Sequence, residues 1–146
     1  MLKKIRKREI LVFIVNCTWG VIQSVAGLIV FLYFINKPHY RYKGSIVTIN
    51  AKPRFLPIKS EYGFSLGIFI FISFKIDKEQ AINDNTVKHE YGHCMQSLLL
   101  GPLDLIIIEI PSAVWFHFFQ NWRKKHNKSY SWFYPEFWAD KWGKVI

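Results

Sequence analysis

Two histidines and a glutamate lie within five residues of one another in the stretch HEYGH, residues 89 to 93. On an α-helix, His89 and His93 are four residues apart and therefore project from the same face. Two neutral imidazole nitrogens at about 2.0–2.1 Å suit zinc, and a catalytic zinc site needs a third protein ligand and one open position. Glu90 would then stand beside a zinc-activated water and take its proton as general base. The spacing therefore predicts a hydrolytic site with one zinc ion.

The C-terminal stretch YPEFWADKWG contains a candidate for the third ligand. Pro135 suits the first turn of a helix and Gly143 suits its end. Glu136 and Asp140 would lie one turn apart, so that Glu136 can bind the metal while Asp140 holds the far nitrogen of a ligand histidine. Glu109 is nearer to the histidines in sequence, but it lies in an apolar run with no acid one turn away. We therefore expect Glu136, and not Glu109, to be the third ligand.

The two motifs together, H-E-x-x-H followed downstream by E-x-x-x-D, resemble those of the gluzincin metallopeptidases, the thermolysin-like group. In that group the two histidines and the downstream glutamate bind zinc, the motif glutamate is the general base, and the aspartate orients a ligand histidine. The resemblance implies that the zinc ligands are His89, His93 and Glu136, with Glu90 as the base and Asp140 as the orienting residue. It also implies a downstream His or Tyr that stabilises the oxyanion, for which the chain offers His117, His126, Tyr130 and Tyr134.

A wider pattern covers about residues 60 to 143, from SLGIFIF through KHEYGHCMQSLLLGPL to FYPEFWADKWG. It resembles a family of small bacterial membrane proteins with an HEYGH motif, which implies a location in the bacterial inner membrane. The connection between His93 and Glu136 is more apolar than in a soluble thermolysin-like enzyme. A reduced or membrane-embedded binding cleft is therefore expected.

The N-terminal part of the chain is typical of a membrane anchor. Residues 10 to 35 contain no charged side chain, and about 20 apolar residues suffice to span a bilayer, so a transmembrane helix is predicted. The net charge is +10, and basic clusters lie beside apolar runs at 3–8, 37–43 and 123–128. This placement suits anionic headgroups, whereas a nucleic-acid-binding surface would interleave basic residues with exposed aromatics. We expect membrane lipid to be a partner and nucleic acid not to be one.

Between the anchor and the C-terminus, the pattern changes from strands to helices. Residues 44 to 75 have short β-branched and aromatic runs bounded by Gly and Pro, which predict two or three strands. A helix of about four turns should carry the HEYGH motif and end at Gly101-Pro102. Residues 98 to 119 are apolar but contain two prolines and two acids, which favour a broken or re-entrant element. Such an element would bring the histidine pair and Glu136 to the same side of a membrane.

These observations predict an α+β fold in two parts. Residues 1–36 form the basic N-terminus and transmembrane anchor, and residues 37–146 form a small zincin-like domain with a membrane-associated segment at about 98–119. The predicted function is a membrane-associated zinc peptidase whose peptide substrate lies along GFSLGIFIFISF. Two alternatives remain: a metal-free basic adaptor at the membrane surface, and a non-catalytic protein with a structural zinc site. The structural site would need a fourth ligand, for which the candidates are His39, His117, His126 and Cys94; for Cys94 we favour a packed small residue.

Overall fold

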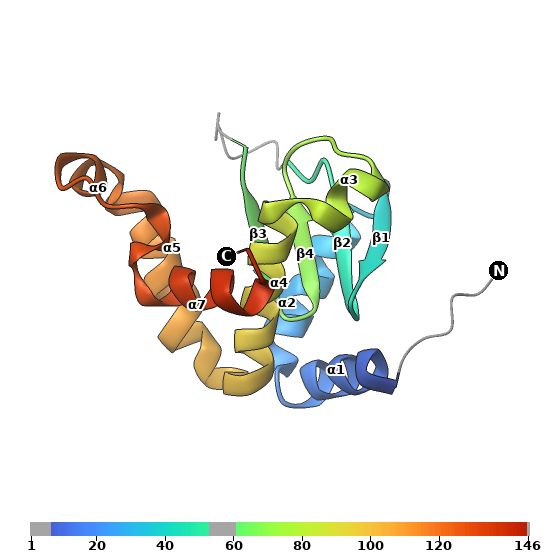
Figure 1. Ribbon diagram of the computed structural model, residues 1–146. Coiled ribbons are helices and arrows are strands. Elements are labelled where there is room, and N and C mark those ends of the chain that lie inside the picture. The colour runs from blue at the N-terminus through green and yellow to red at the C-terminus, as the bar shows by residue number, and fades with distance from the viewer. Residues whose placement is uncertain (1–6, 53–60, 146) are drawn as a thin grey trace.

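The computed structural model describes residues 7–52 and 61–145, and it has a mixed α+β fold (Figure 1). The basic residues 3–6 and the proline-containing stretch 53–60 lie outside the described residues. The seven α-helices of the described part are α1 (Lys7–Thr18), α2 (Val21–Tyr33), α3 (Lys78–Asn83), α4 (Asn85–Leu100), α5 (Ile110–Phe118), α6 (Gln120–Lys125) and α7 (Tyr134–Gly143). The strands are β1 (His39–Tyr42), β2 (Ser45–Ile49), β3 (Gly63–Leu66) and β4 (Phe69–Ile72).

The four strands form one sheet in the order β1-β2-β4-β3. The pairs β1–β2 and β3–β4 are antiparallel, and β2 runs parallel to β4. Because side chains alternate along a strand, Val47 and Ile70 lie in one apolar cluster with α3 and α4, while Ile46 and Phe69 lie in another with α2. The sheet is therefore the middle layer between α2 and the α3–α4 pair (Figure 1), and β3 is left at its edge.

Strands were correctly expected within residues 44–75, although GFSLGIFIFISF is a hairpin and not one long strand. Gly67 has φ +59, a left-handed conformation that suits glycine, and it makes the turn between β3 and β4. Strand β1 was missed, because the sequence around Tyr40 was interpreted as a basic cluster beside a membrane. In the structure Tyr40 and Tyr42 point into the core with the α4 residue Tyr91.

The motif helix α4 has clear signals at both ends. The Asp84 carboxylate accepts hydrogen bonds from the backbone N–H groups of Thr86 and Val87, at 2.8 and 3.2 Å, which caps the helix. Gly101, with φ +55, ends it. Helix α4 packs against the sheet on one side and α7 crosses it on the other (Figure 1), so the motif lies between the sheet and the C-terminal helix.

The apolar stretch 10–35 is divided into two helices, α1 and α2, with a break at Trp19 and Gly20. The break follows from packing: the Trp19 indole lies against Gly101, and the side-chain amide of Gln23 donates a 2.7 Å hydrogen bond to the Gly101 carbonyl. Gly27 lets α2 approach the β3–β4 hairpin, because a β carbon there would lie 2.4 Å from the Leu66 carbonyl oxygen. Helix α2 is therefore held against the sheet by its apolar cluster and by the close approach at Gly27, and against the end of α4 by Gln23.

A sharp bend separates α4 from α5. A short 3₁₀ turn (Gly101–Leu103) and a π-helical turn (Leu105–Glu109) lie between them. The chain direction bends by 119° between the two helical arms, Asn85–Leu103 and Leu105–Phe118. This is the broken element that the sequence predicts for 98–119. In the described part of the chain, no single helix is both long and apolar enough to cross a membrane, whereas this bent pair passes that test by length and composition.

Candidate metal centre

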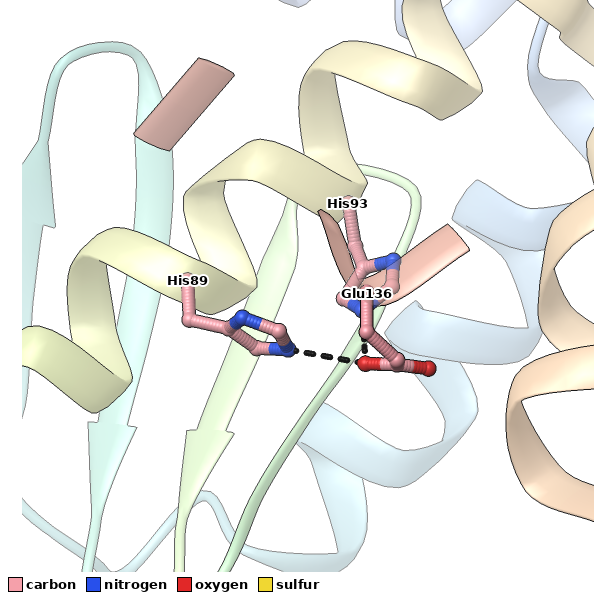
Figure 2. Close-up of side chains that lie close together, drawn as sticks. All are labelled: His89, His93 and Glu136. Carbon is pink, nitrogen blue, oxygen red and sulfur yellow. Dashed lines mark hydrogen bonds and ion pairs between the residues drawn. The ribbon is translucent and has the colours of Figure 1, made fainter. Parts of the chain in front are cut away.

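His89 and His93 from α4 and Glu136 from α7 point toward one another across the crossing of the two helices (Figure 2). The Oε2 atom of Glu136 lies 3.1 Å from His89 Nε2 and 3.4 Å from His93 Nε2. An ion with tetrahedral bonds of about 2.0–2.1 Å separates its ligand atoms by about 3.3 Å. The Glu136 oxygen therefore already lies at the spacing of a zinc ligand from each histidine, and the three candidate ligand atoms are all within 4.8 Å of one another.

The remaining nitrogen of each histidine is held by a hydrogen bond. Asp140 Oδ1 lies 2.6 Å from His89 Nδ1, and Gln96 Oε1 lies 2.7 Å from His93 Nδ1. Because a side-chain amide oxygen only accepts, His93 must donate from Nδ1, which leaves the Nε2 lone pair for a metal. Asp140 fixes His89 in the same way, so both ligand nitrogens face Glu136 with the tautomer that zinc requires.

Two residues that support these hydrogen bonds were not expected from the sequence. Gln96 also donates to the Pro135 carbonyl at 2.9 Å, which ties the His93 ring to the start of α7. The Ser131 hydroxyl donates to the second carboxylate oxygen of Asp140. Gln96 lies three residues after His93, so helical spacing places it on the same face, and this spacing could have revealed it. Ser131 lies in a short 3₁₀ turn (Tyr130–Trp132) before α7 and gave no such signal.

The glycine of HEYGH allows α4 and α7 to meet. A β carbon on Gly92 would lie 1.9 Å from the carbonyl oxygen of Ala139, and one on Gly143 would lie 1.9 Å from the carbonyl oxygen of Lys88. The two helices are thus in backbone contact at both points. This contact brings Glu136 and Asp140, on one face of α7, within reach of the histidines.

The charge state of the metal-free site follows from these contacts. Burial lowers the pKa of His89, but hydrogen bonds with Asp140 and Glu136 outweigh burial and raise that pKa to about 10. Burial raises the pKa of Glu136, but its hydrogen bonds with His89 and His93 outweigh burial and lower that pKa well below its usual range. The metal-free site therefore holds an imidazolium against an ionised carboxylate, and a divalent cation would replace the proton.

The chemistry of the donor set fits zinc. Glu136 is fully buried, and its second carboxylate oxygen, Oε1, makes no hydrogen bond of normal geometry, although Ser112 and Tyr130 lie beside the carboxylate. Burial of an ionised carboxylate is costly, and a cation bound at this carboxylate would offset that cost. Two imidazoles and a carboxylate are also a common ligand set of catalytic zinc sites.

The candidate metal-binding group has three members, His89, His93 and Glu136. Among the described residues, His39, His117, His126 and Cys94 do not join it. The rings of His39 and His126 bond to backbone carbonyls elsewhere, and the buried Cys94 thiol lies in the core between α4 and the sheet. A closed structural site with a fourth protein ligand from these four is therefore not formed in this arrangement. Glu109 also stays outside the group, while Glu136 is part of it.

Glu90, the neighbour of His89 on α4, lines a cavity of about 550 Å³ that His93 also lines. Its carboxylate accepts a 3.1 Å hydrogen bond from the Ser65 hydroxyl on β3. Burial raises the pKa of Glu90, while the two histidines lower it. A buried carboxylate with a raised pKa is a better proton acceptor than an exposed one, so Glu90 has the properties that a base at the cavity wall would need.

Two of the four candidate oxyanion residues line the same cavity, Tyr130 and His117. The other two lie elsewhere: the Tyr134 hydroxyl donates to the Ile107 carbonyl at 2.5 Å, and His126 stacks on Trp122. The Tyr130 ring is centred 6.0 Å from the His89 ring. Burial and the nearby acids Glu136 and Glu90 raise the pKa of Tyr130, which keeps its hydroxyl protonated as a hydrogen-bond donor.

Comparison with protein-family models, with curated proteins and with solved structures finds no match to this chain. The relationship to the gluzincins therefore stays a prediction from two motifs. What the structure adds is the geometry: the histidines, Glu136 and Asp140 lie together, and Glu90 lines the adjoining cavity.

Proposed function

We propose that this protein is a membrane-associated zinc peptidase that hydrolyses peptide bonds with an activated water. The observation that carries the proposal is the position of Glu90, a buried base in the wall of the cavity that also contains His93 of the three-ligand group. Zinc, when bound by His89, His93 and Glu136, supplies a Lewis acid that polarises the carbonyl group and makes water more acidic.

The residues of this chain divide the work of hydrolysis. Glu90 takes a proton from the water while the oxygen of the water attacks the carbonyl carbon. Glu90 then passes that proton to the amide nitrogen as the C–N bond breaks. The second proton of the water also passes to the leaving amine, so the products are a carboxylate and an ammonium group. Asp140 and Gln96 keep the two imidazoles in the required tautomer, and Tyr130 donates a hydrogen bond to the negative charge that develops on the carbonyl oxygen.

Membrane association is supported by the surface of the described chain. Large apolar side chains are exposed along α1, α2, the bend after α4 and the end of α5, and Leu11, Leu32, Ile106 and Phe118 are 61%, 57%, 66% and 79% exposed. Large apolar patches on a surface mark membrane or protein contacts. We place α1, α2 and the α4–α5 bend against the lipid, with the bacterial inner membrane as the proposed location.

Wild-type protein purified in detergent tests the proposal beside His93→Ala. Wild type should contain about one zinc per chain and hydrolyse members of a peptide library, and His93→Ala should lose both properties. Zinc-loaded wild type that cleaves no peptide would contradict the peptidase proposal. Wild type that binds no zinc would favour the metal-free adaptor. Extraction of the full-length protein from membranes by carbonate without detergent would contradict stable insertion.

A further inference from the structure

The cavity beside Glu90 has apolar walls. Helix α2 contributes Ile29 and Val30, Phe34 directly after α2 adds a third apolar side chain, and α5 contributes Ala113 and Phe116. Its described lining contains no Lys or Arg. Cavities of about 300–1,000 Å³ hold ligands larger than one side chain, so 550 Å³ accommodates several apolar groups of a substrate.

A second cavity of about 680 Å³ continues the first, and Phe116, His117 and Tyr130 line both. The second cavity is basic. Besides the shared residues, it is lined by Glu61, Gln120, Arg123, Lys124, Asn127 and Lys128. Three cations face one acid there, so the combined cleft is apolar at one end and positively charged at the other.

At the basic end of the cleft, Arg123 contacts residues that border the metal centre. The Arg123 guanidinium lies 5.0 Å above the Tyr130 ring and 5.4 Å above the Trp115 ring. The Trp115 indole in turn donates a 2.9 Å hydrogen bond to the Tyr130 carbonyl. Such cation–π contacts position Arg123 beside Tyr130, so the positive charge lies at the edge of the proposed reaction site.

Strand β3 lines the first cavity with Gly63, Phe64 and Ser65, and the segment just before it places Tyr62 at the first cavity and Glu61 at the second. Among the residues that the structure describes, β3 is the last strand on its side of the sheet, so an extended peptide can pair with its outer edge. Such a peptide rises about 3.3 Å per residue and would pass from the apolar cavity to the basic one within about four or five residues.

This inference rests on the proposed function. We infer that the substrate is an amphiphilic peptide bound extended along β3, with apolar side chains between α2 and α5 and acidic side chains beside α6. The juxtaposition of the apolar walls, the free strand edge and the Arg123–Lys124–Lys128 group carries it. The shared lining residues place the basic cavity directly beside the cavity of the candidate site, which favours a peptide over a lipid headgroup as the partner of these cations.

Binding to the Glu90→Gln protein tests the inference without cleavage of the peptide. Three fluorescent peptides would share a Leu/Phe-rich half and differ in the other half, which is acidic, neutral or basic. The acidic peptide should bind most tightly and the basic peptide least tightly. Replacing the Leu and Phe residues by Ser should weaken binding about tenfold or more, because each buried apolar side chain contributes favourably.

Lys124→Glu and Lys125→Glu form a matched pair in the Glu90→Gln background. Both change one cation of α6, but only Lys124 lines the cavity. Lys124→Glu should lower the preference for the acidic over the neutral peptide about threefold, whereas Lys125→Glu should change it far less. Equal binding of the three peptides, or equal effects of the two variants, would overturn the inference. So would a Lys124→Glu variant that loses only its binding to anionic vesicles, since its cation would then contact lipid.

If the proposed function is wrong, the experiment gives a different result from the one that overturns the inference about the substrate. Zinc-loaded wild type would cleave none of the three peptides, while the order of binding to Glu90→Gln would still show whether the cleft selects an amphiphilic chain.

Discussion

Substitution of Gly92 by Ala should separate α7 from α4 and remove Glu136 from the metal centre. The added β carbon would lie 1.9 Å from the Ala139 carbonyl oxygen, whereas real β carbons essentially never come closer than 3.0 Å. Helix α7 must therefore withdraw by about 1 Å or more. Zinc–ligand distances tolerate changes of only about 0.2 Å, so the carboxylate of Glu136 can no longer complete the ligand set.

The expected effect is a loss of zinc affinity of at least about 100-fold, because even disturbing a residue behind a ligand costs about 10- to 100-fold. The fold should survive. Overpacking costs about 1–3 kcal/mol, and replacing glycine within a helix by alanine returns up to about 1 kcal/mol. Zinc affinity measured by competition with a chromogenic chelator, together with thermal unfolding of the metal-free protein, separates these two effects.

Leu99→Ala is the matched control for Gly92→Ala, since Leu99 lies on the same helix and is 65% exposed. It should bind zinc as wild type does. The reasoning is refuted if Gly92→Ala binds zinc with the wild-type affinity, because Glu136 would then reach the metal without the close contact of α4 and α7.

Three further predictions concern the same centre. Gln96→Leu removes the acceptor that fixes the His93 tautomer and should weaken zinc binding about 10- to 100-fold; unchanged affinity in the chelator competition would contradict that role. Glu136→Gln should lower zinc occupancy while Glu109→Gln should not, and elemental analysis showing the reverse would move the site into the bend. In metal-free protein, the raised pKa of His89, about 10, means that its charged form contributes its full stabilisation below pH 6.5 and loses it as the pH rises toward 10. The thermal midpoint measured with a chelator present should therefore fall over this range more steeply for wild type than for His89→Gln, and equal slopes would count against the imidazolium.

Helical periodicity predicted which site residues share a face within each helix, whereas the meeting of the two helices was implied only by the gluzincin resemblance. Four-residue spacing places His89 and His93 on one face of α4, and the same spacing places Glu136 and Asp140 on one face of α7. Their supporting partners were harder to predict. Gln96 is also on the α4 face, but a glutamine hydrogen-bonds in many contexts, and Ser65 contacts Glu90 only because β3 passes beside the helix.

The N-terminal stretch shows that apolar content alone is insufficient to predict a single membrane-spanning helix. Residues 10–35 have the length of a membrane span, but they form two helices. Gln23, Ser24 and Gly27 on α2 are buried, and they face protein. A buried glutamine with a specific acceptor on Gly101 fixes α2 against another part of the fold. Apolar periodicity alone does not reveal such a partner 78 residues away.

The most direct test of the central claim compares zinc content and peptide hydrolysis in the same preparations of wild type and Glu90→Gln. Glutamine keeps the size of Glu90 but removes the base, and Glu90 is not among the three ligands. Zinc should therefore remain at about one ion per chain, while hydrolysis should fall by about two orders of magnitude or more. A Glu90→Gln protein that binds zinc and hydrolyses peptide as fast as wild type would contradict the proposed mechanism.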